Sequence, residues 1–243
     1  MQNSPRIALI TGANKGIGFE ICRQIGRTGA TVLLGARKPA AGEKAAAMLV
    51  AEGLIVRFIG LDVDDRPSVS AAADLIAAEY GSLDVLVNNA GITDAADGPP
   101  SRASLDAVER IFRTNFLGAL AVTQAMLPLL RRSQAARIVN VSSGLGSLTL
   151  NGDPGHSFAA TKLIGYSASK AALNMLTVQL AYELRDTAIK VNSADPGFTA
   201  TDLNGHRGHQ TIPEGAAEAI RLAMLPDDGP DGGYSSTEGT VPW

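Results

Sequence analysis

The sequence predicts an α/β fold in which helices cover both faces of a doubly wound, mostly parallel sheet. Short apolar runs rich in β-branched residues alternate along the chain with helical stretches, a pattern typical of parallel strands joined by crossover helices. The runs are nearly continuous in their apolar character, as expected for strands buried on both faces. A chain of 243 residues is long enough for one large core, so we expect a single domain over residues 1–243.

The expected elements follow from these runs in chain order. In the first helix Ile17, Ile21 and Ile25 recur every four residues, which places them on one face against the sheet. Gly29 then ends that helix. The expected strands are 7–10, 31–34, 55–61, 85–87, 138–141 and 189–191, and the further helices are 67–81, 117–130 and 167–184.

Three stretches break the regular rhythm, at 92–104, 144–165 and 197–212. Ligands of open α/β sheets bind beyond the carboxyl ends of the strands. Because two of these stretches directly follow expected strands, we expect the three of them to form the walls of a substrate pocket.

Charge and hydropathy exclude several classes of partner. The formal net charge is −3, and the sequence has no long basic stripe of the kind that nucleic-acid binding needs. We interpret Arg131, Arg132 and Arg137 as cations near the last carbonyls of a helix. No apolar run approaches a membrane span, and the first six residues lack a signal-peptide core. We therefore expect a cytoplasmic chain that binds neither nucleic acid nor membrane.

The single cysteine, Cys22, cannot form an internal disulfide. It falls in the first helical pattern, where a free cysteine usually behaves as a small hydrophobic residue. His206 and His209 stand three apart in a glycine-broken stretch with no obvious third ligand. We expect no metal site there, and a lid segment is the simpler interpretation.

A glycine-rich loop separates the first strand from the first helix. Glycines let a backbone approach a pyrophosphate closely, and the helix N-terminus supplies N–H groups and a favourable dipole. The alternative is a glycine-rich turn without a ligand. The position after a strand and before a helix favours dinucleotide binding on a Rossmann-type fold. The candidate contacts in this loop are Gly12, Asn14, Lys15, Gly16, Ile17 and Gly18.

The spacing of Gly12, Gly16 and Gly18 departs from the G-x-G-x-x-G fingerprint. With Thr11 before it, the loop resembles the T-G-x-x-x-G-x-G motif of the short-chain dehydrogenase/reductase family. Asn14-Lys15 and the final segment 239–243 are similar to the carbonyl reductase branch of that family. The resemblance extends over almost the whole chain.

The end of the second expected strand indicates which dinucleotide binds. An NAD site usually presents an acidic residue there, to hold the adenosine ribose. This chain has Ala36 and then Arg37, and a guanidinium suits a 2′-phosphate. Lys15 in the glycine loop adds a second cation. We therefore expect NADP(H) rather than NAD(H), although an exposed Arg37 without a ligand is the alternative.

The resemblance implies further cofactor contacts after the other strands. It places the residues after the third and fourth strands beside the adenine and its ribose, and the segment after the sixth strand beside the nicotinamide. Taken without the resemblance, Asn88 is interpreted as a structural residue. Thr199 stands in that segment where the family more often has an aliphatic residue, yet its backbone is still expected to hold the carboxamide. The implied contacts are Asp62, Val63, Asn89, Ala90 and Gly91, then Pro196, Gly197, Thr199 and Thr201.

Tyr166 and Lys170 are four residues apart, so their side chains share one helix face. A neighbouring ammonium favours a phenolate, and we expect it, together with the charge of the oxidised nicotinamide, to be able to lower the Tyr166 pKa by roughly two to three units. Such a pair alone is common on surface helices. The resemblance adds Asn115 and Ser143 to this pair as a catalytic tetrad, with Ser142 as the second choice for the serine. The alternatives are that Asn115 is a helix cap and that Ser143 is an ordinary hydroxyl at a strand end.

These residues predict NADPH-dependent reduction of a ketone or aldehyde, with Tyr166 as the proton donor. Leu145, Leu148, Leu150, Phe158, Phe198 and Leu203 favour a hydrophobic substrate. A sugar-nucleotide epimerase or dehydratase, and a dinucleotide sensor without turnover, are the alternatives. The resemblance makes a homo-oligomer somewhat more expected than a monomer.

Overall fold

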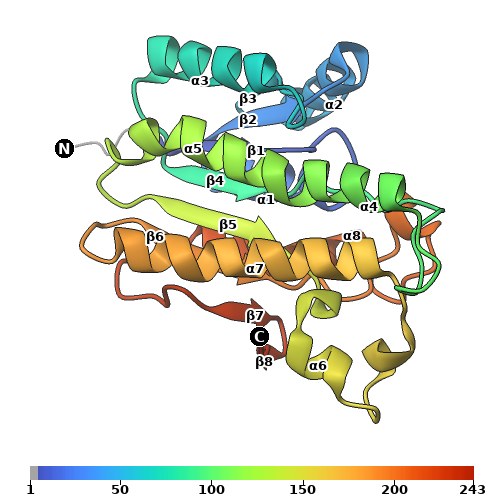
Figure 1. Cartoon of the computed structure of the whole chain (residues 1–243). Helices are drawn as coiled ribbons and strands as arrows, with labels where there is room; N and C mark the ends of the chain where they lie inside the picture. The colour runs from blue at the N-terminus through green and yellow to red at the C-terminus, as the bar shows by residue number, and fades with distance from the viewer. Residues whose placement is uncertain (1–4) are drawn as a thin grey trace.

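Eight strands form one sheet in the computed structural model, which describes residues 5–243 (Figure 1). Their order is β3-β2-β1-β4-β5-β6-β7-β8, and every neighbouring pair is parallel except β7 and β8. The strands are β1 (Ile7–Ile10), β2 (Thr31–Ala36), β3 (Val56–Gly60), β4 (Val85–Asn88), β5 (Arg137–Val141), β6 (Lys190–Ala194), β7 (Tyr234–Ser236) and β8 (Gly239–Thr240). The predicted fold class is confirmed, and the strand order reverses between β1 and β4, where such sheets bind ligands.

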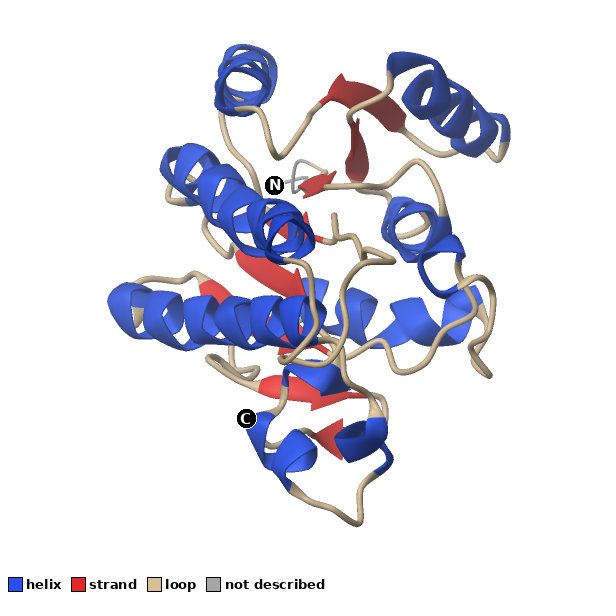
Figure 2. Cartoon of the chain, turned by 45° about the vertical axis from the view of Figure 1, so that its right-hand side comes forward, coloured by secondary structure: helices blue, strands red, loops and turns tan. Residues whose placement is uncertain are grey.

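Helices lie on both faces of this sheet (Figure 2). On one face, residues of α1, α2 and α8 pack against the strands in one apolar cluster. On the other face, residues of α3, α5 and α7 pack against the strands in a second cluster. The main helices are α1 (Gly16–Gly26), α2 (Pro39–Ala51), α3 (Arg66–Tyr80), α4 (Leu105–Phe112), α5 (Ala119–Leu130), α6 (Leu148–Gly152), α7 (Ile164–Leu184) and α8 (Ile212–Ala223). The shorter ones are η1 (Arg113–Gly118), η2 (Gly144–Gly146), η3 (Ser157–Ala160) and η4 (Asp202–Asn204).

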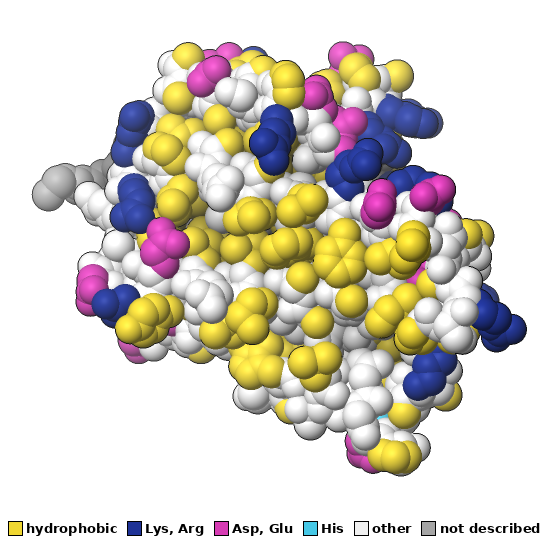
Figure 3. All heavy atoms as spheres, in the orientation of Figure 1, with side chains coloured by type: hydrophobic (Ala, Val, Ile, Leu, Met, Phe, Trp, Pro, Cys, Tyr) yellow, Lys and Arg dark blue, Asp and Glu magenta, His cyan; other side chains and the backbone are white. Residues whose placement is uncertain are grey.

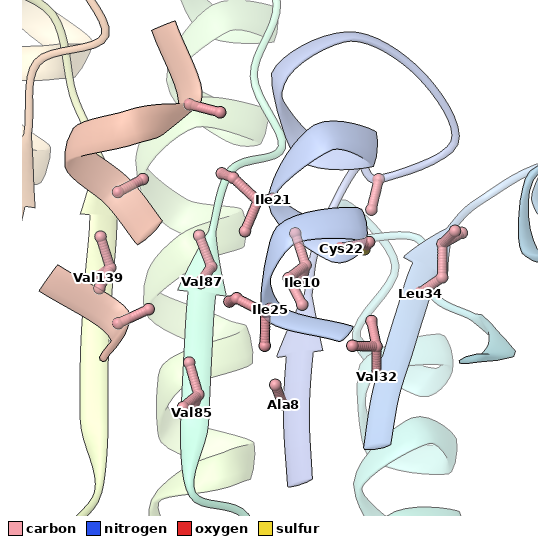
Figure 4. Close-up of a cluster of buried hydrophobic side chains, with 14 of the residues drawn as sticks. Ala8, Ile10, Ile21, Cys22, Ile25, Val32, Leu34, Val85, Val87 and Val139 are labelled. Carbon is pink, nitrogen blue, oxygen red and sulfur yellow. The ribbon is translucent and has the colours of Figure 1, made fainter. Parts of the chain in front are cut away.

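The first helix packs on the sheet as its sequence pattern predicts. Ile21 and Ile25 are fully buried and lie over the strands β1 and β4 (Figure 4). Ile17 is only partly buried but packs against the same cluster. Cys22 is buried beside them, and this burial raises the pKa of its thiol. The cysteine is therefore a core residue, as expected.

Several elements were missing from the sequence prediction. The helix α2 has no clear apolar stripe, and the strands β7 and β8 are too short to form a visible run. The helix α8 does carry a signal, because Thr211 and Glu214 form a capping box at its start. In the edge strand β3 only Ile59 is fully buried, and Arg57 and Gly60 are exposed, which corrects the expectation that every strand is apolar throughout.

The interpretation of Arg137 as a helix-end cation is wrong. Arg137 opens β5 and is 1% exposed. Its guanidinium donates to the carbonyls of Leu225, Ala136 and Ala188 and pairs with Asp227 at 2.8 Å. A buried cation needs such partners, so Arg137 joins β5 to the segment after α8.

In the part of the chain that the structure describes, no helix has the length and apolar character to cross a membrane. The expectation about a signal peptide concerns mainly residues 1–4, which lie outside the described residues.

Candidate active site

The glycine-rich loop between β1 and α1 has the shape of a phosphate cradle. Gly12 and Gly16 adopt φ values of +62° and +59°, which side chains rarely allow. A β-carbon at Gly12 would lie 2.8 Å from the Cα of Ala90. Lys15 is the N-cap of α1 and makes no side-chain cap bond within the described chain, which leaves first-turn N–H groups for an anion. These features fit a dinucleotide pyrophosphate.

Thr11 and Asn89 tie this loop to the end of β4. The Thr11 hydroxyl accepts hydrogen bonds of 3.0 Å from the backbone N–H groups of Asn89 and Ala90. The Asn89 amide donates to the carbonyls of Thr11 and Gly12 at 2.9 and 3.2 Å. The side-chain nitrogen of Asn89 therefore holds the loop, a role that the sequence analysis did not assign to it.

The neighbouring Asn88 is structural, as the sequence analysis expected. It is buried, and its amide donates to Thr123 on α5 and to Asn140 on β5, both at 2.9 Å. The side-chain oxygen of Asn88, Oδ1, is buried without a hydrogen-bond partner in the described chain.

The two cations proposed for the 2′-phosphate are both exposed. Arg37 directly follows β2, at the carboxyl edge of the sheet. Lys15 forms an ion pair of 2.5 Å with Asp202, which belongs to the segment after β6. His206 contacts the other oxygen of Asp202 at 2.8 Å. Among residues 5–243, no group of three or more His, Cys, Asp or Glu side chains is placed to hold a metal.

The remaining predicted cofactor residues also follow strands at this edge. Asp62 and Val63 come after β3, and Val63 packs so closely on Gly118 that a β-carbon there would approach it to 2.9 Å. Thr199 is 4% exposed and its hydroxyl donates to the carbonyl of Pro196. Its backbone N–H donates to the carbonyl of Gly197, and its backbone carbonyl accepts from the Asn204 amide at 2.9 Å, so both backbone groups of Thr199 have a partner within this segment.

The helix α7 brings Tyr166 and Lys170 to the end of β5. The Lys170 ammonium lies 5.7 Å from the centre of the Tyr166 ring and donates to the carbonyl of Val141 at 2.7 Å. The Ser143 hydroxyl lies close enough to the Tyr166 phenol to lower the pKa of that phenol as a hydrogen-bond partner. Ser142 instead is buried, with its hydroxyl 3.5 Å from the Lys170 carbonyl. This geometry favours Ser143 over Ser142 as the partner of the phenol.

Asn115 lies in the single π-helical turn of the described chain, η1, between α4 and α5. Such turns occur often at functional sites. Its side chain exchanges hydrogen bonds with the backbone of Ile92 at 2.8 and 3.0 Å and donates to Ser169 at 3.0 Å. A β-carbon at Gly91 would lie 3.5 Å from Asn115 Oδ1 and 3.6 Å from Lys170 Nζ. All four predicted catalytic residues therefore meet at one place.

In the protein alone the Tyr166 pKa is raised, whereas the expected lowering included the charge of the oxidised nicotinamide. Burial raises the pKa of Tyr166 to about 12, the Ser143 hydrogen bond opposes the rise, and the charge of Asp195 adds to it. Burial also lowers the pKa of Lys170 to about 8, which Asp195 opposes. Desolvation is the largest cause of both pKa shifts because both side chains are buried.

Asp195 and Tyr234 were not assigned a role from the sequence. Asp195 follows β6 and accepts from the backbone N–H of Gly197 at 3.0 Å, and burial raises its pKa. The Tyr234 hydroxyl donates to the carbonyl of Ser143 at 2.5 Å, and its ring stacks on Trp243. The position of Asp195 directly before Pro196 was a usable signal; Tyr234 offered none.

Comparison with known proteins agrees with this geometry. The family model described as short chain dehydrogenase matches residues 6–211. A short-chain dehydrogenase of Penicillium roqueforti is 37% identical over 89% of this chain and 88% of its own length. Carbonyl reductase (NADPH) 1 of Sus scrofa is 35% identical over 100% of this chain and 96% of its own.

A solved structure agrees as well. The NADPH-bound carbonyl reductase from chicken fatty liver superposes with a TM-score of 0.86 at 27% identity, covering 98% of this chain and 99% of that one. The predicted family is confirmed: this chain belongs to the short-chain dehydrogenase family and is an oxidoreductase of that family.

Proposed function

We propose that this chain reduces a ketone or aldehyde to an alcohol, with NADPH as the hydride donor and Tyr166 as the proton donor. The observation that carries the proposal is the meeting of Tyr166, Ser143, Lys170 and Asn115 beside the glycine-rich loop. NADPH reduction of carbonyls also agrees with the printed names of the relatives from Sus scrofa and chicken fatty liver.

The chain's own residues have separate tasks in this reaction. Ser143 holds the carbonyl oxygen, and Tyr166 donates a proton to it as negative charge develops. A Tyr166 pKa of about 12 keeps the phenol protonated at neutral pH, which suits an acid. Lys170 would hold the ribose hydroxyls next to the nicotinamide, and the glycine-rich loop would hold the pyrophosphate. The bound cofactor supplies the hydride.

Arg37 and Lys15 give the proposed preference for NADP(H). Both are exposed cations on neighbouring loops at the carboxyl edge of the sheet, and a guanidinium pairs well with phosphate. We expect Arg37→Ala to raise the KM for NADPH on the order of tenfold and to leave the KM for NADH unchanged. An equal rise with both cofactors would remove Arg37 from the phosphate site.

The substrate walls remain the three loops at 92–104, 144–165 and 197–212. The Phe158 ring and the Asp195 carboxylate both lie against Gly144, since a β-carbon built there would collide with the ring and come within 3.0 Å of Asp195 Oδ2. Phe198 and Leu203 are 48% and 43% exposed. Apolar side chains on two walls support a hydrophobic carbonyl compound as the substrate.

Tyr166→Phe tests the reaction directly. The variant keeps the ring and loses the acidic proton, so we expect NADPH oxidation with a panel of hydrophobic ketones and aldehydes to fall about 100-fold or more. NADPH binding should stay within twofold, measured by titration calorimetry. A wild-type chain that binds NADPH and reduces none of these compounds would instead be a dinucleotide sensor.

We also propose a homo-oligomer. Hydrophobic side chains gather over α5 and α7 on the face seen in Figure 3. Among them Met175 and Tyr182 on α7 and Leu117 on η1 are 56%, 70% and 52% exposed. A second copy of the chain would cover these residues. Light scattering after size-exclusion chromatography should give at least twice the mass of the chain, and Tyr182→Glu should reduce it.

A further inference from the structure

The first turn of the catalytic helix α7 has no local cap. Its N-cap residue is Leu163, which makes no side-chain cap bond, and leucine is among the least favoured residues at this position. The first intrahelical hydrogen bond runs from the N–H of Ser167 to the carbonyl of Leu163. The N–H groups of the three residues before Ser167 therefore need acceptors from elsewhere.

The loop that follows β4 supplies all three acceptors. The N–H of Ile164 donates to the carbonyl of Gly98 at 3.0 Å. The Asp97 carboxylate accepts from Gly165 at its Oδ1 and from Tyr166 at its Oδ2, both at 2.9 Å. One carboxylate from 69 positions upstream thus binds the backbone of the catalytic tyrosine itself.

Close packing leaves little room for another arrangement. A β-carbon at Gly165 would lie 3.2 Å from Asp97 Oδ1 and 3.1 Å from Ile111 on α4. Asp97 is half-buried, and its Oδ1 also accepts from the N–H of Gly98 at 2.8 Å. Hydrogen bonds to a charged carboxylate are short and strong, and a negative charge is favourable at a helix N-terminus.

We propose that Asp97 is a positioning residue that fixes the catalytic Tyr166 from the substrate loop 92–104. The inference rests on the proposed function, because it concerns the phenol of that same site. Tyr166 is the third residue of α7, within the turn where helices fray. Without the carboxylate, this turn would loosen beside the flexible Gly165, and the phenol would lose its fixed place next to Ser143.

Asp97→Ala and Asp97→Asn test the proposal, with Asp65→Ala as the matched control. Asp65 caps α3 by accepting from Ser68, so it is also a carboxylate at a helix start, but outside the site. We expect Asp97→Ala to lower kcat roughly 10- to 100-fold, since small displacements in a site cost that much. Asp97→Asn keeps one acceptor oxygen and should recover part of this loss.

The KM for NADPH should stay within twofold in all three variants. If Asp97 only stabilises the helix end, Asp97→Ala and Asp65→Ala should lower the melting temperature alike, and both should keep kcat within twofold of wild type. That result would overturn the proposal. Hydrogen exchange over residues 163–169 gives a readout that does not depend on turnover. Exchange should accelerate there in Asp97→Ala and stay unchanged in Asp65→Ala.

These two measurements separate the proposal from the proposed function. If the wild type reduces no carbonyl, the proposed reaction is wrong, and the exchange data still decide whether Asp97 fixes the Tyr166 backbone. Unchanged exchange over 163–169 in a folded Asp97→Ala variant contradicts the proposal whatever the activity.

Discussion

The two faces of the sheet are packed with different chemistry. On the face covered by α1, α2 and α8, the strands β1, β2 and β4 contribute only Ala, Val, Leu and Ile side chains to the buried cluster, and the buried charged residues Glu20, Glu218 and Arg137 lie on α1, on α8 and at the start of β5. On the face covered by α5 and α7, the carboxyl half of the sheet buries a row of polar side chains instead. That row runs from Thr123 through Asn88, Asn140 and Thr177 to Ser193 by hydrogen bonds of 2.8 to 2.9 Å.

The difference indicates how stability and geometry are divided between the two faces. Apolar burial stabilises without preferring a direction, whereas hydrogen bonds require defined distances and angles. The polar row links β4, β5 and β6 to α5 and α7, and α7 carries Tyr166 and Lys170. We therefore expect the apolar face to determine mainly the free energy of unfolding, and the polar face mainly the rate of the reaction.

The largest effect on rate is expected at Lys170, at the active-site end of the polar face. Lys170→Met keeps much of the buried side chain and removes the ammonium that contacts Val141 and faces the Tyr166 ring. We expect kcat to fall roughly 100- to 10,000-fold, the range for groups that support proton transfer. The decrease in NADPH absorbance measures this.

Lys44→Met on the exposed side of α2 is the control for Lys170→Met and should keep the wild-type kcat. A kcat for Lys170→Met within tenfold of wild type would mean that this ammonium is not needed for the chemistry.

The apolar face should respond in the opposite way. Ile25→Ala removes a fully buried side chain of the cluster in Figure 4. We expect a loss of about 2 to 5 kcal/mol in the free energy of unfolding, because the lost burial and the remaining cavity both cost energy. Denaturation in urea measures the loss, and kcat at 25 °C should be unchanged. A drop in kcat without a drop in stability would break the comparison.

Asn140 and Val139 sharpen the comparison because they are neighbours on one strand and face opposite sides. Asn140→Ala leaves Asn88 and Thr177 without one of their partners, and we expect a loss of about 1 to 3 kcal/mol in stability. We also expect kcat to fall severalfold, because the hydrogen bond that joins β5 to Thr177 on α7 is lost. Urea denaturation and NADPH oxidation give the two values.

Val139→Ala removes a side chain of the apolar cluster instead, and it should cost stability while keeping kcat. Equal loss of kcat in both variants would show that the two faces do not differ in the way proposed.

Much of the fold and of the placement of the candidate site residues was predictable because the signals are local. The glycine loop, the Tyr166 and Lys170 spacing and the strands β1, β4 and β5 all depend on residues close together in sequence. The role of Asp97 was not predictable, because its partners lie 68 and 69 positions away and Leu163 gives no sign of a capped helix. The interpretation of Arg137 was wrong for the same reason, because the groups that accept hydrogen bonds from its guanidinium lie in distant segments.

The direction of the Tyr166 pKa shift was also beyond the sequence. A spacing of four residues shows that an ammonium is near, but the pKa depends equally on how completely folding removes water from the phenol. Burial is the largest cause for both Tyr166 and Lys170. Only the packed structure contains that information.

The smallest effect is expected for Asp195, whose charge acts on the pKa values of both buried residues and so on the pH dependence of the reaction. Its charge raises the pKa of Lys170, which burial lowers to about 8, and it raises the pKa of Tyr166 as well. Asp195→Asn removes the charge, so both pKa values should fall. In the proposed reaction Tyr166 must be protonated and Lys170 charged, and these forms exist below their pKa values. The alkaline limb of kcat against pH, near pH 8 in the wild type, should therefore move to lower pH.

The charged or titratable groups around Asp195 are Lys170, Tyr166, Tyr234 and Glu238. Glu238→Gln is the control, because the Glu238 charge affects the pKa of Asp195 but not those of Tyr166 and Lys170. The alkaline limb of this variant should move less than that of Asp195→Asn. A movement of the Asp195→Asn limb to higher pH would contradict the assignment, since removing a negative charge cannot favour the protonated forms of a phenol and an amine. An unmoved limb would mean that a group other than Lys170 or Tyr166 sets the alkaline side of the profile.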